Sequence, residues 1–154
     1  MWTRFALAAL LVTLLTSSCG GAAAAPPPET LLGTWNAASV QLVSMADSTV
    51  QVDLVGDLGA TVTLVLAANK DFTLTVTYTG EEPGVPPWAA SSVVTGTWSS
   101  TDILTLRTSP TSEWQFEIDL QGDMLTLTEA DTSFDFRGDG TMEDADLGFI
   151  LTRA

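Results

Sequence analysis

Residues 72–78 read FTLTVTY, and this stretch decides the fold class because apolar and polar side chains alternate along it. Successive side chains of a β-strand point to opposite faces, so the apolar members lie on one face and the threonines on the other. The stretch therefore predicts a half-buried strand, and the short turn at residues 69–71 predicts a hairpin with the apolar residues 61–66. The apolar face consists of Phe72, Leu74, Val76 and Tyr78.

Strand patterns of the same kind recur about every ten residues on both sides of this stretch, with turn residues between them. No stretch shows the periodicity of an amphipathic helix. Short turns join most of the strands, and closure into a barrel removes exposed sheet edges. The sequence therefore predicts an all-β fold, an antiparallel meander closing into an eight- to nine-stranded barrel. The other predicted strands cover residues 34–43, 50–54, 61–66, 92–99, 103–107, 114–120, 124–128 and 147–153.

The tripeptide Gly-Thr-Trp stands at residues 33–35, at the start of the first predicted strand, and again at residues 96–98. The first copy, followed by about eight meandering strands, resembles the Gly-x-Trp opening of lipocalins and of small lipocalin-like domains of bacterial lipoproteins. The resemblance covers essentially all of residues 30–154. It implies that Trp35 plugs the closed end of the barrel and that Arg153 packs over its ring. The chain lacks the Thr-Asp-Tyr motif, the terminal helix and the disulfide of true lipocalins.

The N-terminal residues have the composition of an export signal. Arg4 supplies a positive end, and the apolar residues 5–15 suit a signal peptide but are too short to cross a bilayer. The stretch LLTSSC, residues 14–19, ends on Cys19, the only cysteine, and resembles the lipobox of bacterial lipoproteins. The alternative is an ordinary secretory signal with an incidental cysteine.

The lipobox resemblance implies that residues 1–18 are removed as a signal peptide and that Cys19 is acylated. Residues 19–29 then form an Ala/Pro-rich tether, and residues 30–154 form the barrel domain. The protein is expected to be lipid-anchored in the bacterial cell envelope, at the periplasmic or extracellular face. In a Gram-negative host the membrane would be the outer one.

Charge and composition exclude several functions. The chain has 5 Lys and Arg against 19 Asp and Glu, and removal of Arg4 leaves 4 against 19, a side-chain charge of −15. Such a surface repels nucleic-acid phosphates and anionic headgroups, so the lipid anchor must provide the contact with the membrane. The chain has no histidine, which is the commonest general base in enzymes. Acylation would use its single thiol, so thiol catalysis is not expected either. Glu117 and Asp119 alternate with apolar residues and are expected to face solvent, so we expect no enzyme.

The acidic stretch DFRGDGTMEDAD, residues 135–146, resembles a calcium-binding loop of the DxDxDG type. Hard oxygen ligands at alternate positions suit calcium, and Gly140 stands at the sharp turn. Arg137, however, occupies a position where an oxygen ligand belongs. The alternative is a solvated, metal-free loop between the last two strands. The predicted Ca²⁺ ligands are Asp135, Asp139, Thr141, Glu143 and Asp146.

The barrel interior is the other candidate site, because eight strands enclose either packed side chains or one small ligand. The many large rings favour a filled interior or a narrow apolar pocket. Two functions stay open. One is a membrane-anchored module for a small apolar or amphipathic ligand, and the other is a non-catalytic structural or interaction lipoprotein with a packed barrel and an acidic loop. Neither requires a cofactor. The predicted inward rings are Trp35, Phe72, Tyr78, Trp98, Trp114, Phe116 and Phe149.

Overall fold

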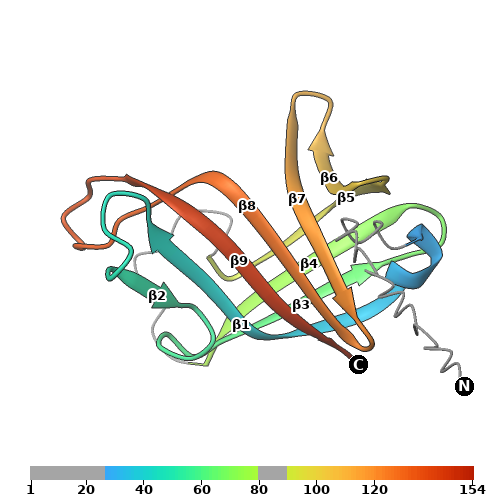
Figure 1. The fold of residues 1–154 in the computed structure, drawn as a ribbon, viewed down its shortest axis with the longest axis horizontal. Helices are drawn as coiled ribbons and strands as arrows, with labels where there is room; N and C mark the ends of the chain where they lie inside the picture. Colours follow the sequence, from blue (N-terminus) through green and yellow to red (C-terminus); the bar gives the residue numbers. More distant parts are fainter. Residues whose placement is uncertain (1–26, 80–89) are drawn as a thin grey trace, which may run out of the picture.

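The computed structural model describes residues 27–79 and 90–154, and Figure 1 shows the course of the chain. The predicted signal peptide, Cys19 and most of the predicted tether lie outside the described residues. The last tether residues belong to a short 3-10 helix, η1 (Pro28–Leu31). In the described part, no helix has the length and the apolar character needed to cross a membrane.

The described residues otherwise form nine antiparallel strands. Their order in the sheet is β2-β1-β3-β4-β5-β6-β7-β8-β9, and β9 also pairs with β1. That pairing closes eight strands into a barrel, with β2 as an extra short strand on β1, and it confirms the predicted fold class. The strands are β1 (Gly33–Ser44), β2 (Gln51–Asp53), β3 (Ala60–Leu66), β4 (Asp71–Tyr78), β5 (Ser92–Ser100), β6 (Ile103–Ser109), β7 (Ser112–Gln121), β8 (Met124–Phe134) and β9 (Glu143–Arg153).

Strand β4 shows how the sequence pattern makes the core. Phe72, Leu74 and Val76 are 1–3% exposed, while the intervening threonines are partly or fully exposed. β4 pairs in register with β3, Leu74 opposite Leu64, so the apolar faces of both strands point into the barrel. Burial of these side chains contributes about 1.5–3 kcal/mol each, which is what holds a disulfide-free barrel together.

Trp35 closes one end of the barrel. Its ring is fully buried, and its indole N–H donates a hydrogen bond to the carbonyl of Leu31, 2.9 Å away, in η1. The guanidinium carbon of Arg153 lies 4.2 Å from the ring centroid. Nη1 and Nη2 of Arg153 donate to the carbonyl oxygens of Leu32 and Thr30, each at 2.7 Å. Arg153 thus fixes the η1 segment over the Trp35 ring.

Trp98, from the second Gly-Thr-Trp, lies at the same end. The first tripeptide begins at Gly33, which pairs with Leu66 at the end of β3. A turn of residues 67–70 then leads into β4, and the first residue of β4 pairs with Thr97 of the second tripeptide. The indole N–H of Trp98 donates to the carbonyl of Ala67 at 3.0 Å, and Lys70 Nζ lies 4.1 Å from the ring centroid. Both copies of the tripeptide therefore bring a buried, hydrogen-bonded ring under a cation at one end of the barrel.

Strands β7 and β8 separate halfway along their length. They pair from Gln121 and Met124 only as far as Glu117 and Thr128. Beyond that point β7 pairs with β6, and β8 pairs with β9. The register between β8 and β9 shifts after Glu129, and such a bulge bends a strand and increases its twist. Figure 1 shows the β6–β7 hairpin projecting away from β8 and β9.

The acidic loop is shorter than the sequence predicted. β8 continues to Phe134 and β9 begins at Glu143, whereas the sequence prediction ended the first strand at Thr128 and began the second at Leu147. The register of β8 on β9 resumes with Thr132 opposite Ala145 after the bulge. The extra pairing on β9 carries the acidic residues on both sides of the loop into the sheet.

Candidate functional site

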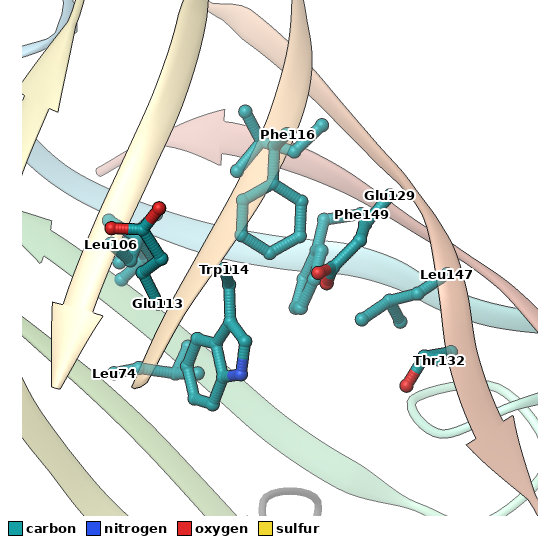
Figure 2. A pocket seen from close by; sticks show the side chains of 11 residues that line it. Leu74, Leu106, Glu113, Trp114, Phe116, Glu129, Thr132, Leu147 and Phe149 are labelled. Carbon is teal, nitrogen blue, oxygen red and sulfur yellow. The ribbon is translucent and has the colours of Figure 1, made fainter. Parts of the chain in front are cut away.

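A cavity of about 240 Å³ lies inside the barrel (Figure 2). Its walls consist of five leucines from the inward faces of five strands, three aromatic rings and three polar side chains. The predicted inward rings thus divide into two groups, because neither Trp35 nor Trp98 at the closed end lines the cavity. The leucines are Leu64, Leu74, Leu106, Leu127 and Leu147, the rings are Trp114, Phe116 and Phe149, and the polar residues are Glu113, Glu129 and Thr132.

The three rings form the aromatic side of the cavity. Phe116 and Phe149 pack edge to face, with centroids 5.7 Å apart and an interplanar angle of 82°. Both are nearly fully buried, whereas Trp114 is half-buried next to them on β7. Trp114 stands in the part of β7 that no longer pairs with β8, and its ring lines the cavity there (Figure 2).

Glu129 comes from the inner face of β8. It continues the alternation of the buried Leu125 and Leu127, and it is half-buried. Figure 2 shows its carboxylate turned toward the space beside the Phe116 and Phe149 rings. A carboxylate at an inward position of a barrel strand is unusual, because burying an ionised group costs free energy unless polar or charged partners compensate for it.

Glu113 stands at the edge of the cavity on β7 and is part of an ion pair. Its Oε2 accepts hydrogen bonds from Arg107 Nη2 at 2.7 Å and Nε at 3.2 Å, and its Oε1 accepts one from Gln115 Nε2 at 2.8 Å. The hydrogen bonds from Arg107 and then Gln115 hold the pKa of the Glu113 carboxyl below its ordinary value. Glu113 is therefore ionised at neutral pH.

A shallower, more polar depression adjoins the cavity on the outside of the barrel. Both Glu113 and Glu129 line the cavity and this depression, so the two spaces meet where β7 and β8 separate. The remaining residues of the depression are Ile103, Gln115, Glu117, Thr128 and Asp146. Glu117 points outward and is exposed, as is Asp119 further along β7, which confirms their predicted orientation.

The structure does not bring the five predicted calcium ligands together. Asp135 instead closes the loop by itself, since its carboxylate accepts backbone N–H groups of Arg137, Asp139 and Gly140 at 2.6–3.2 Å. The hydrogen bond from Gly140 is the largest cause that holds the pKa of Asp135 below its usual value.

The two predicted calcium ligands beyond the loop, Glu143 and Asp146, lie on β9 and point in different directions. Glu143 Oε1 lies 3.1 Å from Arg137 Nε, whereas Asp146 is exposed on the outer face. Across residues 27–79 and 90–154, no group of three or more His, Cys, Asp or Glu side chains is placed to hold a metal ion. Calcium binding stays a prediction, which native mass spectrometry of the full chain with and without a chelator would test.

The sequence prediction missed Glu129 as a cavity residue. The signal was present, because LTLTE, residues 125–129, places Glu129 on the face of Leu125 and Leu127. Because the predicted strand ended at Thr128, Glu129 was assigned to the solvated loop. Glu113 was missed because its role depends on the separation of β7 from β8, which is a matter of long-range pairing.

The chain was compared with models of protein families, with curated proteins and with solved structures, and no significant match was found.

Proposed function

We propose that this chain is a non-catalytic, lipid-anchored binding module whose barrel takes a small apolar or amphipathic molecule. The supporting observation is the cavity of about 240 Å³, lined by leucines and three rings and continuous with an outer depression. A packed structural barrel would leave no such space, since protein interiors hold few voids larger than a water molecule. The cavity therefore favours the binding module over the packed interaction protein.

The size of the cavity limits the ligand. Pockets for drug-sized ligands occupy about 300–1,000 Å³, so a cavity of about 240 Å³ suits a smaller molecule. Leucines and aromatic rings offer such a molecule dispersion contacts and desolvation, and the carboxylates at the opening offer hydrogen bonds or charge. These features support a ligand with an apolar body and one polar end.

The cellular address in this proposal rests on the sequence around Cys19. The resemblance of residues 14–19 to a lipobox supports acylation of Cys19 and anchoring in the bacterial cell envelope, with the barrel held near the membrane. The side-chain charge of the domain is strongly negative, so its surface would not be drawn to anionic headgroups. The acyl chains would supply the attachment, at about 0.8 kcal/mol per buried CH₂ group.

The experiment is a calorimetric titration of hexan-1-ol into the full chain and into the variant Leu74→Phe. Leu74 lines the cavity and is 3% exposed. The larger ring is expected to enter the open space, to leave the unfolding midpoint nearly unchanged and to weaken hexan-1-ol binding at least about tenfold. Val93→Phe is the control for the added phenylalanine ring, because Val93 is 65% exposed on β5 and does not line the cavity.

Two results would contradict the proposal. One is that the wild-type chain binds no hexan-1-ol. The other is that Leu74→Phe unfolds more easily by about 1–3 kcal/mol, the cost of overpacking an interior that is already filled.

A further inference from the structure

We infer that the cavity selects small organic cations, molecules with an ammonium-type group on an apolar body. This inference rests on the proposed binding function and adds the chemical class of the ligand. The feature that carries it is Glu129, which presents a carboxylate on the inner face of β8, in line with Leu125 and Leu127. The Glu129 carboxylate inside the barrel therefore favours a positively charged ligand.

The charged residues that line the cavity are acidic only. Of the residues that the structure describes, Glu113 and Glu129 line it, and no lysine or arginine does. Arg107 lies nearby, but its guanidinium is bound to Glu113 at 2.7 Å, so that pair contributes little net charge. Glu117 and Asp146 add two further carboxylates to the adjoining depression, which shares Glu113 and Glu129 with the cavity. A cation approaching the opening therefore meets a negative field, whereas an anion is repelled.

The cations of the barrel domain are already engaged elsewhere. Lys70 lies over the Trp98 ring, Arg153 lies over the Trp35 ring, and Arg137 lies 3.1 Å from Glu143. With Arg107 these are all the basic residues of the described chain. None of these four basic residues lines the cavity, so the charge that its described lining presents to a ligand is negative.

The aromatic rings of the cavity suit the same ligand. An ammonium group near Glu129 would lie beside the Phe116 and Phe149 rings, which Figure 2 shows next to that carboxylate. Ring faces attract cations, and the attraction is stronger where water is excluded. The leucines on the far side would receive the apolar part of the molecule. Charge, rings and apolar wall together define an amphipathic cation that is small enough for about 240 Å³.

The test compares three probes of one chain length, namely hexylammonium, hexan-1-ol and hexanoate, in calorimetric titrations of the full chain at neutral pH. Hexylammonium is expected to bind at least about tenfold more tightly than hexan-1-ol, and hexanoate is expected to bind least. Glu129→Gln keeps the shape of the side chain and removes its charge. It is expected to abolish the preference for hexylammonium, because hexylammonium binding should weaken at least about tenfold more than hexan-1-ol binding.

Asp119→Asn is the matched control, because it removes one exposed carboxylate from the outer face of β7. It is expected to keep the preference. The inference is overturned if hexan-1-ol binds the wild-type chain as tightly as hexylammonium, or if Glu129→Gln keeps the preference. If none of the three probes binds, the proposed binding function fails as well, so the two failures are told apart.

Discussion

At the residue scale, Asp53 joins β2 to the bulged part of β1. The register of β1 on β9 shifts between Ala37 and Ser39, and the Asp53 carboxylate lies next to this shift. It accepts hydrogen bonds from Ser39 Oγ at 2.7 Å, from the Val40 N–H at 3.1 Å and from the Val55 N–H at 2.9 Å. Burial raises the pKa of the Asp53 carboxyl, but these hydrogen bonds and one from the Gly56 backbone together outweigh burial and lower it.

Asp53→Ala is expected to reduce the free energy of unfolding by about 2 kcal/mol at neutral pH, because the four donors lose an ionised acceptor. The folded-state pKa lies below the unfolded value of 3.8. The contribution of Asp53 is therefore complete above the unfolded pKa and is lost as pH falls through the folded pKa. Denaturant titrations at neutral pH and at about pH 3 should show the difference between wild type and variant shrinking on acidification. An equal difference at both values would refute this role, and Asp119→Ala serves as the exposed control.

At the element scale, Gly96 lets β5 pack closely against β6 and β4. A Cβ atom at this position would lie 2.1 Å from the Arg107 carbonyl oxygen and 2.8 Å from the Phe72 ring. Real side chains do not approach backbone so closely, so only glycine fits without moving a strand. In the second Gly-Thr-Trp, the glycine therefore permits the close contact between strands, and the tryptophan packs at the closed end of the barrel.

Gly96→Ala is expected to lower the free energy of unfolding by about 3 kcal/mol through overpacking. Gly148→Ala on β9 is the matched control, since a Cβ there would meet nothing within 4 Å. It should change stability by less than about 0.5 kcal/mol. Chemical denaturation of both variants measures the difference. Similar unfolding midpoints for the two would show that β5 and β6 are not tightly joined at Gly96.

The elements could be predicted where local pattern decides them. The stretch FTLTVTY was identified as a strand because its alternation alone separates a buried face from a wetted one. The separation of β7 and β8 could not be predicted, because it depends on which distant strand each backbone pairs with and on a bulge after Glu129. The sequence left a filled interior and a narrow apolar pocket both open. The position of the cavity could not be predicted for the same reason, because it lies where Trp114 stands beyond the last β7–β8 pair.

At the scale of the whole molecule, the barrel is closed at one end and hollow further along. Trp35 and Trp98 occupy the closed end with their cations, and the cavity lies beyond them, where Glu129 and the three rings meet. The η1 segment that precedes the barrel is fixed at the closed end by Arg153.

Cys19→Ala is expected to move the protein from the membrane fraction to the soluble fraction, because the thiol that would carry the acyl chains is lost. Cell fractionation with detection of the full chain measures this. A Cys19→Ala protein that stayed with the membrane would contradict lipid anchoring. Asp119→Asn, far from the N-terminus in sequence, should remain in the membrane fraction.

The central claim is that a small molecule occupies the cavity at Trp114 and leaves the closed end untouched. The most direct test is nuclear magnetic resonance of the tryptophan indole N–H groups of the full chain during addition of hexylammonium. The Trp114 signal is predicted to shift progressively, while the signals of Trp35 and Trp98 stay in place, because their N–H groups are bound to backbone carbonyls away from the cavity. An unmoved Trp114 signal, or equal shifts at all three rings, would contradict the account.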